Sequence, residues 1–290
     1  MLNVRFILLL LLATLALPCE ADTADRVVVA ELLREYQRES GISVADLDTA
    51  SFDKLMQGQT VNRKISMTLS GASDGDNSIT RVVGYRLIDK PREPLWLTAL
   101  AVDGGFSKRL TEHFVRMHDN GGACWYQHVD MPWPLKDRHW LVRSDKNLSV
   151  AQHTDNRLWE HFWRLVPDAK TEIDALYAKG NVSGLTQKQK EKSVMLPLNN
   201  GAWVMGLVNP NRTLVMVHAT LDMGGIIPDG FVARQSRINL TRTLTKIEQD
   251  ADSAWARYGD AYRIYRGDGT LIRPQDAKPA QALTTQRSAR

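Results

Sequence analysis

Hydrophobic residues recur with two different periods along this chain. In Ala24–Arg38 they recur every four residues, at Val28, Leu32 and Tyr36, which predicts a helix. Beyond Thr60 the chain instead shows extended segments separated by turn-forming residues, which predicts strands. The strands are expected near Val61–Leu69, Ile79–Ile88, Leu110–Met117, Ala123–Val129, His139–Val150, Arg157–Val166, Val194–Val208 and Thr213–Leu221.

Two further helices are expected. A short one covers Arg92–Val102, with Pro94 in its first turn, and a long one runs from Pro228 to Tyr258. The long helix carries one apolar stripe at helical spacing, made of Ala233, Leu240, Leu244, Ile247, Ala251 and Ala254.

The order of these elements predicts an α+β fold. Consecutive strands joined by turns form an antiparallel sheet, and the long C-terminal helix must bury its apolar stripe on that sheet. Two outcomes are open on these grounds. The sheet and helix enclose an ordinary core, or a curved sheet grips the helix and leaves a cavity between them.

The N-terminus has the features of a secretory signal peptide. Arg5 precedes the apolar run Phe6–Leu17, and Cys19 and Ala21 are small residues at the −3 and −1 positions of a cleavage site. The run is shorter than the ~20 apolar residues that span a bilayer. We expect cleavage after Ala21 and an exported protein, periplasmic or secreted. The expected divisions are a signal peptide at 1–21, an N-terminal helix at 22–48, the main domain at 49–265 and a disordered tail at 266–290.

Composition narrows the possible partners. Apolar residues make up 43% of the chain and charged residues 24%, which excludes a fibre or a wholly disordered chain. The net charge of +4 is small and the basic residues are scattered, so no nucleic-acid partner is expected. The lysines of Gln187–Lys192 fit either a solvated loop or contact with an anionic membrane surface.

Most enzyme and metal motifs are missing from the sequence, including GxSxG, HExxH, CxxC and phosphate-loop glycines. His113 and His118 are five apart on an expected strand, so they face opposite sides and cannot form a metal pair. Cys124, the one cysteine left after cleavage, is interpreted as a small buried hydrophobe rather than a nucleophile. We therefore expect no metal and no cofactor.

One segment, DMPWPLKDRHWLVRS, carries a denser pattern than the rest of the chain. Pro132 and Pro134 bracket Trp133, and Asp137 and Arg138 open the next strand. On local grounds alone, the segment also fits a structural corner followed by a surface ion pair.

The segment resembles the loop and central strand of START-type lipid-binding domains. Asp222–Gln235 (DMGGIIPDGFVARQ) resembles the same family's entry to its C-terminal helix, through Asp222, Gly224, Gly225 and Pro228. The resemblance extends over about residues 50–255. It implies a helix-grip fold, in which a curved antiparallel sheet wraps the C-terminal helix around a hydrophobic cavity. It also implies a lipid or similar ligand and, with the signal peptide, an exported bacterial member; some relatives in the wider superfamily are cyclases.

The sequence departs from the family pattern at two places. Met195 stands where the family often has an arginine, which puts a polar anchor for a lipid head group in doubt. The stretch 170–192 is longer than usual and would lie near the cavity mouth.

The alternation of side chains along the strands, and the spacing along the last helix, select residues that could line the cavity. For each of them the alternative is ordinary packing in the core. Arg86 is either a polar anchor for the ligand or a surface arginine on the open side of its strand. The full candidate set is Arg86, Trp125, Trp159, His161, Trp163, Met216, His218, Phe231, Gln235 and Ile238.

Three functions are compatible with these features. The first is a monomeric lipid-binding or lipid-transfer protein that touches membranes transiently and performs no chemistry. The second is an enzyme of the same fold, cyclase- or hydrolase-like, with His161, His218 or Glu160 as acid or base. The third is a partner-binding module with a filled core.

Overall fold

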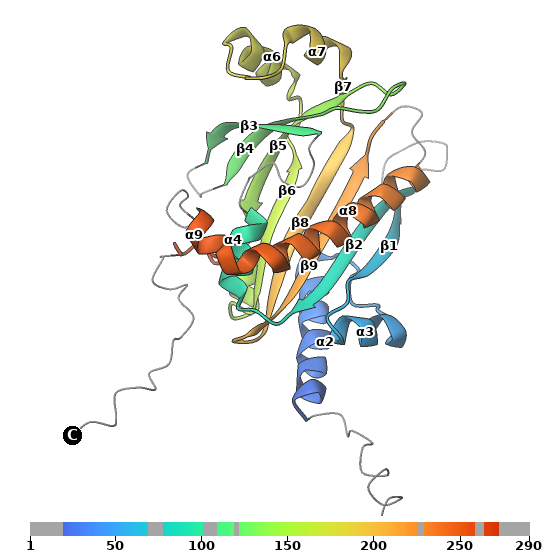
Figure 1. The fold of residues 1–290 in the computed structure, drawn as a ribbon, viewed down its shortest axis with the longest axis vertical. Helices are drawn as coiled ribbons and strands as arrows, with labels where there is room; N and C mark the ends of the chain where they lie inside the picture. The colour runs from blue at the N-terminus through green and yellow to red at the C-terminus, as the bar shows by residue number, and fades with distance from the viewer. Residues whose placement is uncertain are drawn as a thin grey trace, which may run out of the picture.

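The computed structural model describes residues 20–68, 78–100, 109–118, 122–224, 229–258 and 264–272. Within these ranges one sheet has helices on both of its faces (Figure 1). Its strands are β1 (Val61–Thr68), β2 (Ser78–Ile88), β3 (Leu110–Met117), β4 (Ala123–Val129), β5 (Arg138–Lys146), β6 (Leu158–Leu165), β7 (Val194–Met195), β8 (Leu198–Asn209) and β9 (Arg212–Asp222). The helices are α2 (Glu20–Ser40), α3 (Thr49–Met56), α4 (Arg92–Leu100), α5 (Leu148–His153), α6 (Lys170–Ala178), α7 (Gln187–Lys192), α8 (Asp229–Asp250) and α9 (Ala254–Tyr258).

The sheet order is β1-β2-β9-β8-β6-β5-β4-β3, and neighbours along this path are antiparallel. The short strand β7 is added in parallel to β5. Helix α8 crosses one face of the curved sheet, over β2, β9 and β1 (Figure 1). The predicted helix-grip arrangement of sheet and C-terminal helix is therefore confirmed.

Both faces of the central strands are covered. On one face, α4, α8 and α9 pack on β6, β8 and β9, around Trp96, Trp159 and Leu244. On the opposite face, α2 lies against β8 and buries Leu32 and Tyr36. This explains why strands such as β6 carry apolar bulk at both odd and even positions, since neither face meets water.

Several elements differ from the sequence expectation. The strand expected to reach Val150 ends at Lys146, because Asn147 caps α5 by accepting a hydrogen bond from the Val150 N–H (3.3 Å). The strand expected over Val194–Val208 is two strands, separated at Pro197, which has no N–H for the ladder. The region 170–192 contains α6 and α7 rather than a loop, and α3 was not predicted.

The long C-terminal helix is interrupted after Asp250 by a short 3₁₀ turn before α9. The chain after residue 265 does not begin as a disordered tail. Tyr265 and Leu271 form a β-bridge, and Ile272 is buried in the core under α4 and α9.

The expected signal-peptide run lies outside the described residues, so cleavage after Ala21 stays a prediction. None of the described helices has the length and apolarity needed to cross a membrane.

Candidate ligand cavity

A cavity of about 330 Å³ lies between the sheet and α8. Strands β3, β4, β5, β6, β8 and β9 form its wall, and α4 and α8 cover it. Four tryptophans from four different strands line it: Trp125, Trp140, Trp163 and Trp203. Half of the eight tryptophans of the sequence thus lie on one apolar surface.

The indole N–H groups of two of these tryptophans are already bonded. Trp163 Nε1 donates to Asn199 Oδ1 (2.9 Å), and Trp140 Nε1 donates to Gln127 Oε1 (2.5 Å). A buried indole needs such a partner, because its N–H would otherwise be desolvated without compensation. Both rings therefore present their carbon atoms to the cavity.

The cavity wall contains one carboxyl group at the end of a hydrogen-bonded chain. Gln127 accepts from Trp140 and donates through its amide nitrogen to Glu112 Oε1. Burial raises the pKa of Glu112, while the hydrogen bond from Gln127 lowers it by less. Among the described residues, the second carboxyl oxygen of Glu112 has no hydrogen bond and is free for a ligand.

His161 is the second titratable group of the wall, on β6 opposite Trp203. Burial, with a smaller effect from Lys146, lowers the pKa of His161 to about 3, so its imidazole is neutral at neutral pH. On β5, His161 is in register with Lys146, whereas Glu112 lies in the row of Gln127 and Trp140. Six residues of extended strand separate these rows, about 20 Å.

Of the predicted cavity residues, the structure places Trp125, His161 and Trp163 on the wall. Trp159 points to the same side but is buried below the cavity, where Arg92 stacks on its ring (3.5 Å to the centroid) and Trp96 packs edge-on. The prediction that Trp159 lines the cavity is wrong.

Arg86 is not an anchor for a ligand. Its Nη1 donates to Thr60 Oγ1 (3.0 Å), and its Nη2 pairs with Glu248 near the C-terminal end of α8. The ion pair with Glu248 fixes α8 on β2, and the hydrogen bond to Thr60 holds the chain just before β1. The predicted anchor role is replaced by a structural one.

Met216 and His218 face away from the cavity, toward α2. There the Tyr36 hydroxyl donates to Glu160 Oε1 (2.8 Å) and lies 2.8 Å from His218 Nε2. Because a hydroxyl has one proton, His218 must donate to Tyr36 from Nε2–H. Met216 is part of the same buried cluster as Tyr36. His218 and Glu160 are therefore excluded as acid or base in the cavity.

Burial explains the titration of this network. It lowers the pKa of His218 to about 3 and raises the pKa of Glu160. Asn147 Nδ2 donates to the other carboxyl oxygen of Glu160 (2.6 Å). The polar groups between α2 and the sheet thus bind one another rather than a ligand.

The predictions on α8 fail or fall outside the described residues. Ile238 is 38% exposed and does not line the cavity, whereas Asn239, Leu240 and Thr243 do. Ile238 lies two residues from Leu240, about 200° around the helix. The side chains of Phe231 and Gln235 lie outside the described ones.

The two family-like motifs meet in space through Arg138. This buried side chain donates from Nε to the Met223 carbonyl (2.5 Å) and from Nη2 to the Gly224 carbonyl (3.0 Å). Asp137 instead accepts from the Met131 N–H (2.8 Å). The alternative of a surface ion pair between Asp137 and Arg138 is therefore wrong.

The remaining motif residues have local roles. Asp222 Oδ1 accepts from the Gly224 N–H (2.7 Å), which closes the turn after β9. Trp133, joined to Pro134 by a cis peptide bond and preceded by Pro132, is 92% exposed. Gly225 and Pro228 lie outside the described residues.

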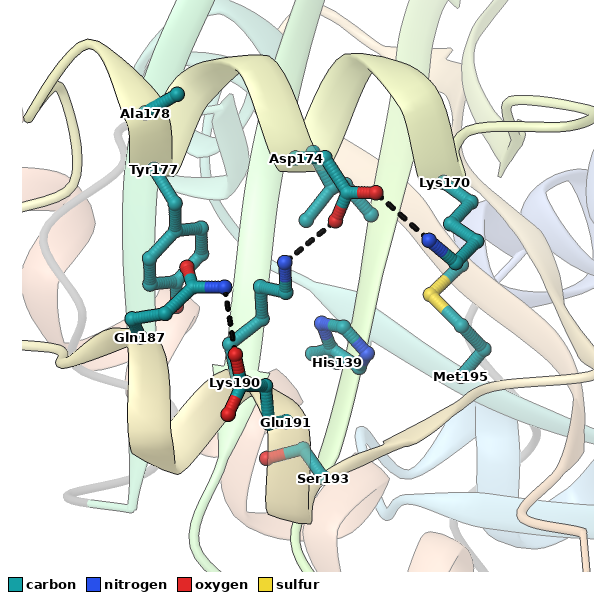
Figure 2. Close-up of a pocket in the computed structure, with 11 residues that line it drawn as sticks. His139, Lys170, Asp174, Tyr177, Ala178, Gln187, Lys190, Glu191, Ser193 and Met195 are labelled. Atoms are coloured by element: carbon teal, nitrogen blue, oxygen red, sulfur yellow. Dashed lines mark hydrogen bonds and ion pairs between the residues drawn. The ribbon is translucent and has the colours of Figure 1, made fainter.

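A larger groove, of about 740 Å³, lies on the periphery between α6, α7 and the β5 edge (Figure 2). Asp174 accepts ion pairs from both Lys170 and Lys190, and the Lys190 side chain is only 11% exposed. The groove's lysines thus pair with one of its own carboxylates, and the position of Lys190 does not fit the solvated-loop alternative for 187–192. This makes the groove a weaker candidate than the cavity under α8.

Cys124 is buried, and its Sγ lies 3.2 Å from His118 Nε2. Burial raises the pKa of the Cys124 thiol, against smaller opposite effects of Arg116 and Arg143. The thiol is thereby kept protonated, as expected for a small buried side chain rather than a nucleophile.

Sequence reasoning missed Glu112, Gln127, Trp140 and Trp203. Strand alternation contained part of the missing signal, because Gln127 is two residues from Trp125 on the same face. No sequence signal pointed to Glu112, since a single acidic residue in a strand is ordinarily solvated.

The fold and cavity define a helix-grip protein with a largely apolar site between its sheet and α8. The sequence matches no protein-family model and no curated protein. Among solved structures, human STARD10 is similar at 11% identity and a TM-score of 0.48, over 69% of this chain and 78% of that one. A STAR-related lipid transfer protein from Xanthomonas axonopodis is similar at 12% identity and a TM-score of 0.45, over 66% and 93%.

The Zhui aromatase/cyclase from Streptomyces sp. R1128 is also similar, at 13% identity and a TM-score of 0.37, over 61% of this chain and 96% of that one. These similarities concern the fold, which the sheet order and the position of α8 define independently.

Proposed function

We propose that this chain is an exported binding protein that holds one compact hydrophobic molecule in the cavity under α8. The observation that carries the proposal is the cavity itself, lined by four indoles, two of which have their N–H groups bonded to neighbouring side chains. Each methylene that enters such a wall contributes about 0.8 kcal/mol of transfer free energy. A ligand of a dozen carbons therefore has a gross driving force of about 10 kcal/mol, and the costs of ordering offset much of it.

The cavity volume favours a particular size of ligand. About 330 Å³ is at the lower end of the ~300–1,000 Å³ of pockets that hold drug-sized molecules. A single acyl chain or a compact ring system fits this space better than a lipid with two long chains. Glu112 supplies the polar contact, since its free carboxyl oxygen is suited to a hydroxyl or similar donor.

A cyclase- or hydrolase-like enzyme is the second candidate, because two titratable groups, Glu112 and His161, line one cavity. General acid–base catalysis requires groups within hydrogen-bonding reach of the same reacting atoms. The strand register places these two in rows about 20 Å apart, and His161 is neutral at neutral pH. Binding without chemistry is therefore the better supported function.

Ligand exchange requires contact with a membrane or another carrier, because a hydrophobic ligand has low solubility in water. Trp133 is 92% exposed and lies in the loop that joins β4 to β5, beyond the row of Gln127 and Trp140 that contains Glu112. Indoles partition to membrane interfaces. We assign this loop the transient membrane contact.

The test is native mass spectrometry of the purified chain, with extraction of any bound molecule, followed by titration with cis-parinaric acid. The four wall tryptophans transfer excitation energy to this polyene when it binds. Thr243→Trp fills the cavity from α8, whereas Arg242→Trp adds the same side chain on the exposed side of the helix.

The expected result is 1:1 binding that Thr243→Trp weakens at least tenfold and Arg242→Trp leaves unchanged. Equal binding by the two variants, or a wild-type chain that neither carries nor takes up a hydrophobic molecule, contradicts the proposal. Turnover of a bound ligand into a new mass would instead support the enzyme. N-terminal sequencing of protein recovered outside the cytoplasm tests export, with Asp22 expected as the first residue.

A further inference from the structure

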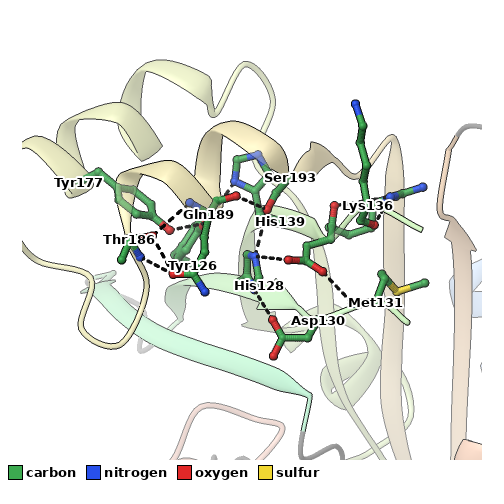
Figure 3. Close-up of polar contacts among 12 residues, drawn as sticks. Tyr126, His128, Asp130, Met131, Lys136, His139, Tyr177, Thr186, Gln189 and Ser193 are labelled. Atoms are coloured by element: carbon green, nitrogen blue, oxygen red, sulfur yellow. Dashed lines mark hydrogen bonds and ion pairs between the residues drawn. The ribbon is translucent and has the colours of Figure 1, made fainter. Parts of the chain in front are cut away.

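A second cluster of polar residues lies outside the cavity, at the base of the loop between β4 and β5 (Figure 3). His128 is near the end of β4, Asp130 follows that strand, and Asp137 immediately precedes β5. One ring nitrogen and one oxygen from each carboxylate lie within 4.8 Å of one another. None of these three residues is among the described residues that line the cavity under α8.

The hydrogen bonds of Ser193 fix the tautomer of His128. Ser193 has one hydroxyl proton, and it donates that proton to the Gln189 carbonyl (2.7 Å). Its oxygen must therefore accept from His128 Nε2–H, which is 3.0 Å away. Neutral His128 then carries its lone pair on Nδ1.

The Nδ1 lone pair faces a carboxylate rather than a donor. His128 is 0% exposed, and among the described residues Nδ1 has no hydrogen-bond partner. The nearest charged atom is Asp130 Oδ1, at 3.5 Å, which is longer than a hydrogen bond. His128 Nδ1 is buried, whereas the Asp130 side chain is 60% exposed, so the two facing acceptors mark a place that a cation from solvent can enter to offset their repulsion.

We propose that His128, Asp130 and Asp137 bind a divalent transition-metal ion of the zinc class. Two ligands about 2.1 Å from one tetrahedral ion lie roughly 3.4 Å apart, close to the Nδ1–Oδ1 separation. An imidazole with two carboxylates suits such an ion and leaves a coordination position for water. The contact from His128 Nε2–H to Ser193 is the supporting hydrogen bond that metal-bound histidines usually make.

Asp137 has the capacity to join this site. Its Oδ1 accepts from the Met131 N–H, which holds the carboxylate in place and leaves Oδ2 for the ion. Oδ2 lies 3.8 Å from Nε2 of His128, on the Ser193 side of the ring, so its side chain must shift toward Nδ1 to ligate the same ion; one ligand atom of each of the three residues nevertheless lies within 4.8 Å of the others. The ion would tie the loop of Trp133 to the C-terminal end of α7, where Ser193 is the capping residue.

This site was not expected from the sequence, because one histidine and two aspartates spread over ten residues match no common metal motif. The turn between β4 and β5 brings them together.

The test uses the full chain after treatment with EDTA, titrated with Zn²⁺ by calorimetry and with Co²⁺ by visible absorption. Asp130→Asn is the main variant, since Asp130 is exposed and its replacement leaves the fold intact. His153→Asn is the matched control, because His153 pairs with the carboxylate of Glu39 (2.8 Å) on another part of the surface.

The expected result is one Zn²⁺ per chain, bound at least tenfold more weakly by Asp130→Asn and equally well by His153→Asn. Co²⁺ should give visible bands that Asp130→Asn loses. Absence of Zn²⁺ binding at micromolar concentrations, or unchanged binding by Asp130→Asn, overturns the proposal.

Discussion

Replacing Tyr36 by phenylalanine removes a single hydroxyl from a buried junction of α2, β6 and β9. In the native chain this hydroxyl donates to Glu160 and accepts from His218, each at 2.8 Å. The substitution keeps the ring, so the packing of the cluster around it is preserved. What it leaves behind is a carboxyl oxygen and an imidazole N–H with no partner in a water-free place.

The cost follows from those two groups. A buried polar group left unsatisfied costs about 1–3 kcal/mol, and more when it is charged. Because Glu160 has a raised pKa and can take up a proton, part of its cost is relieved. We expect a loss of about 2–3 kcal/mol, or a fall in Tm of roughly 4–12 °C for a domain of this size.

The assay is urea and thermal unfolding at pH 7, followed by circular dichroism. Tyr265→Phe is the matched control, since the Tyr265 hydroxyl makes no hydrogen bond to the described residues. Binding of cis-parinaric acid should stay unchanged in Tyr36→Phe, because the network faces α2. A Tyr36→Phe variant as stable as the control, or one that loses ligand binding, would refute the assignment of His218 to the outer face.

Three further outcomes are expected. Gly201→Ala should destabilise the chain by about 3 kcal/mol in urea unfolding and weaken binding of parinaric acid. The reason is that a Cβ at this position would lie 2.2 Å from the His218 carbonyl and 2.4 Å from the Trp163 ring. Wild-type stability of this variant would contradict the close approach. Stability should fall as the pH drops from about 6.5 toward 4, because His139 and His218 have pKa values of about 4 and about 3 in the fold, so only the unfolded chain takes up these protons. Each of the two histidines lowers the free energy of unfolding by up to about 2 kcal/mol at pH 5. The raised pKa of Glu160 offsets part of this loss. Urea midpoints that do not fall between pH 7 and pH 5 would argue against neutral buried histidines. Trp133→Ala should leave Tm unchanged but reduce co-sedimentation with anionic vesicles several-fold; equal co-sedimentation would move the membrane contact elsewhere.

The architecture was predictable because it depends on periodicity, which the sequence carries directly. Strand alternation, the apolar stripe of the last helix and the order of elements together specify an antiparallel sheet with a helix on it. Leu244, Ile247, Ala251 and Ala254 of the predicted stripe are all buried. Ile238 was selected outside that stripe, and its exposure follows from the same periodicity.

The facing of β9 could not be predicted, because the strand is apolar at both odd and even positions. The hairpin turn pairs Asn209 with Arg212, and a regular continuation would set Trp203 opposite His218, on the cavity side. A bulge between Leu207 and Asn209 shifts the register by one residue, so Trp203 pairs with Val217 instead. A shift of one residue reverses every side chain beyond it, which is why Met216 and His218 face α2.

The same limit applies to groups whose role depends on contacts made across the fold. Arg86 is an arginine in an apolar strand, and only the distant Glu248 determines that its charge is used by the protein itself. Arg138 is similar, because its partners are carbonyls 85 and 86 residues away. Sequence spacing contains no information on such pairs.

Strand β6 shows how one strand separates stability from binding. Glu160 and His161 are neighbours in sequence, yet alternation places Glu160 under α2 and His161 on the cavity wall. Burial disfavours the charged form of both, so it raises the pKa of one and lowers that of the other. Glu160 has both oxygens occupied, by Tyr36 and Asn147, and has no capacity left for a ligand. Glu112 keeps one oxygen free on the cavity face, so the polar contact with a ligand belongs to β3, at the end of the sheet where the Trp133 loop begins.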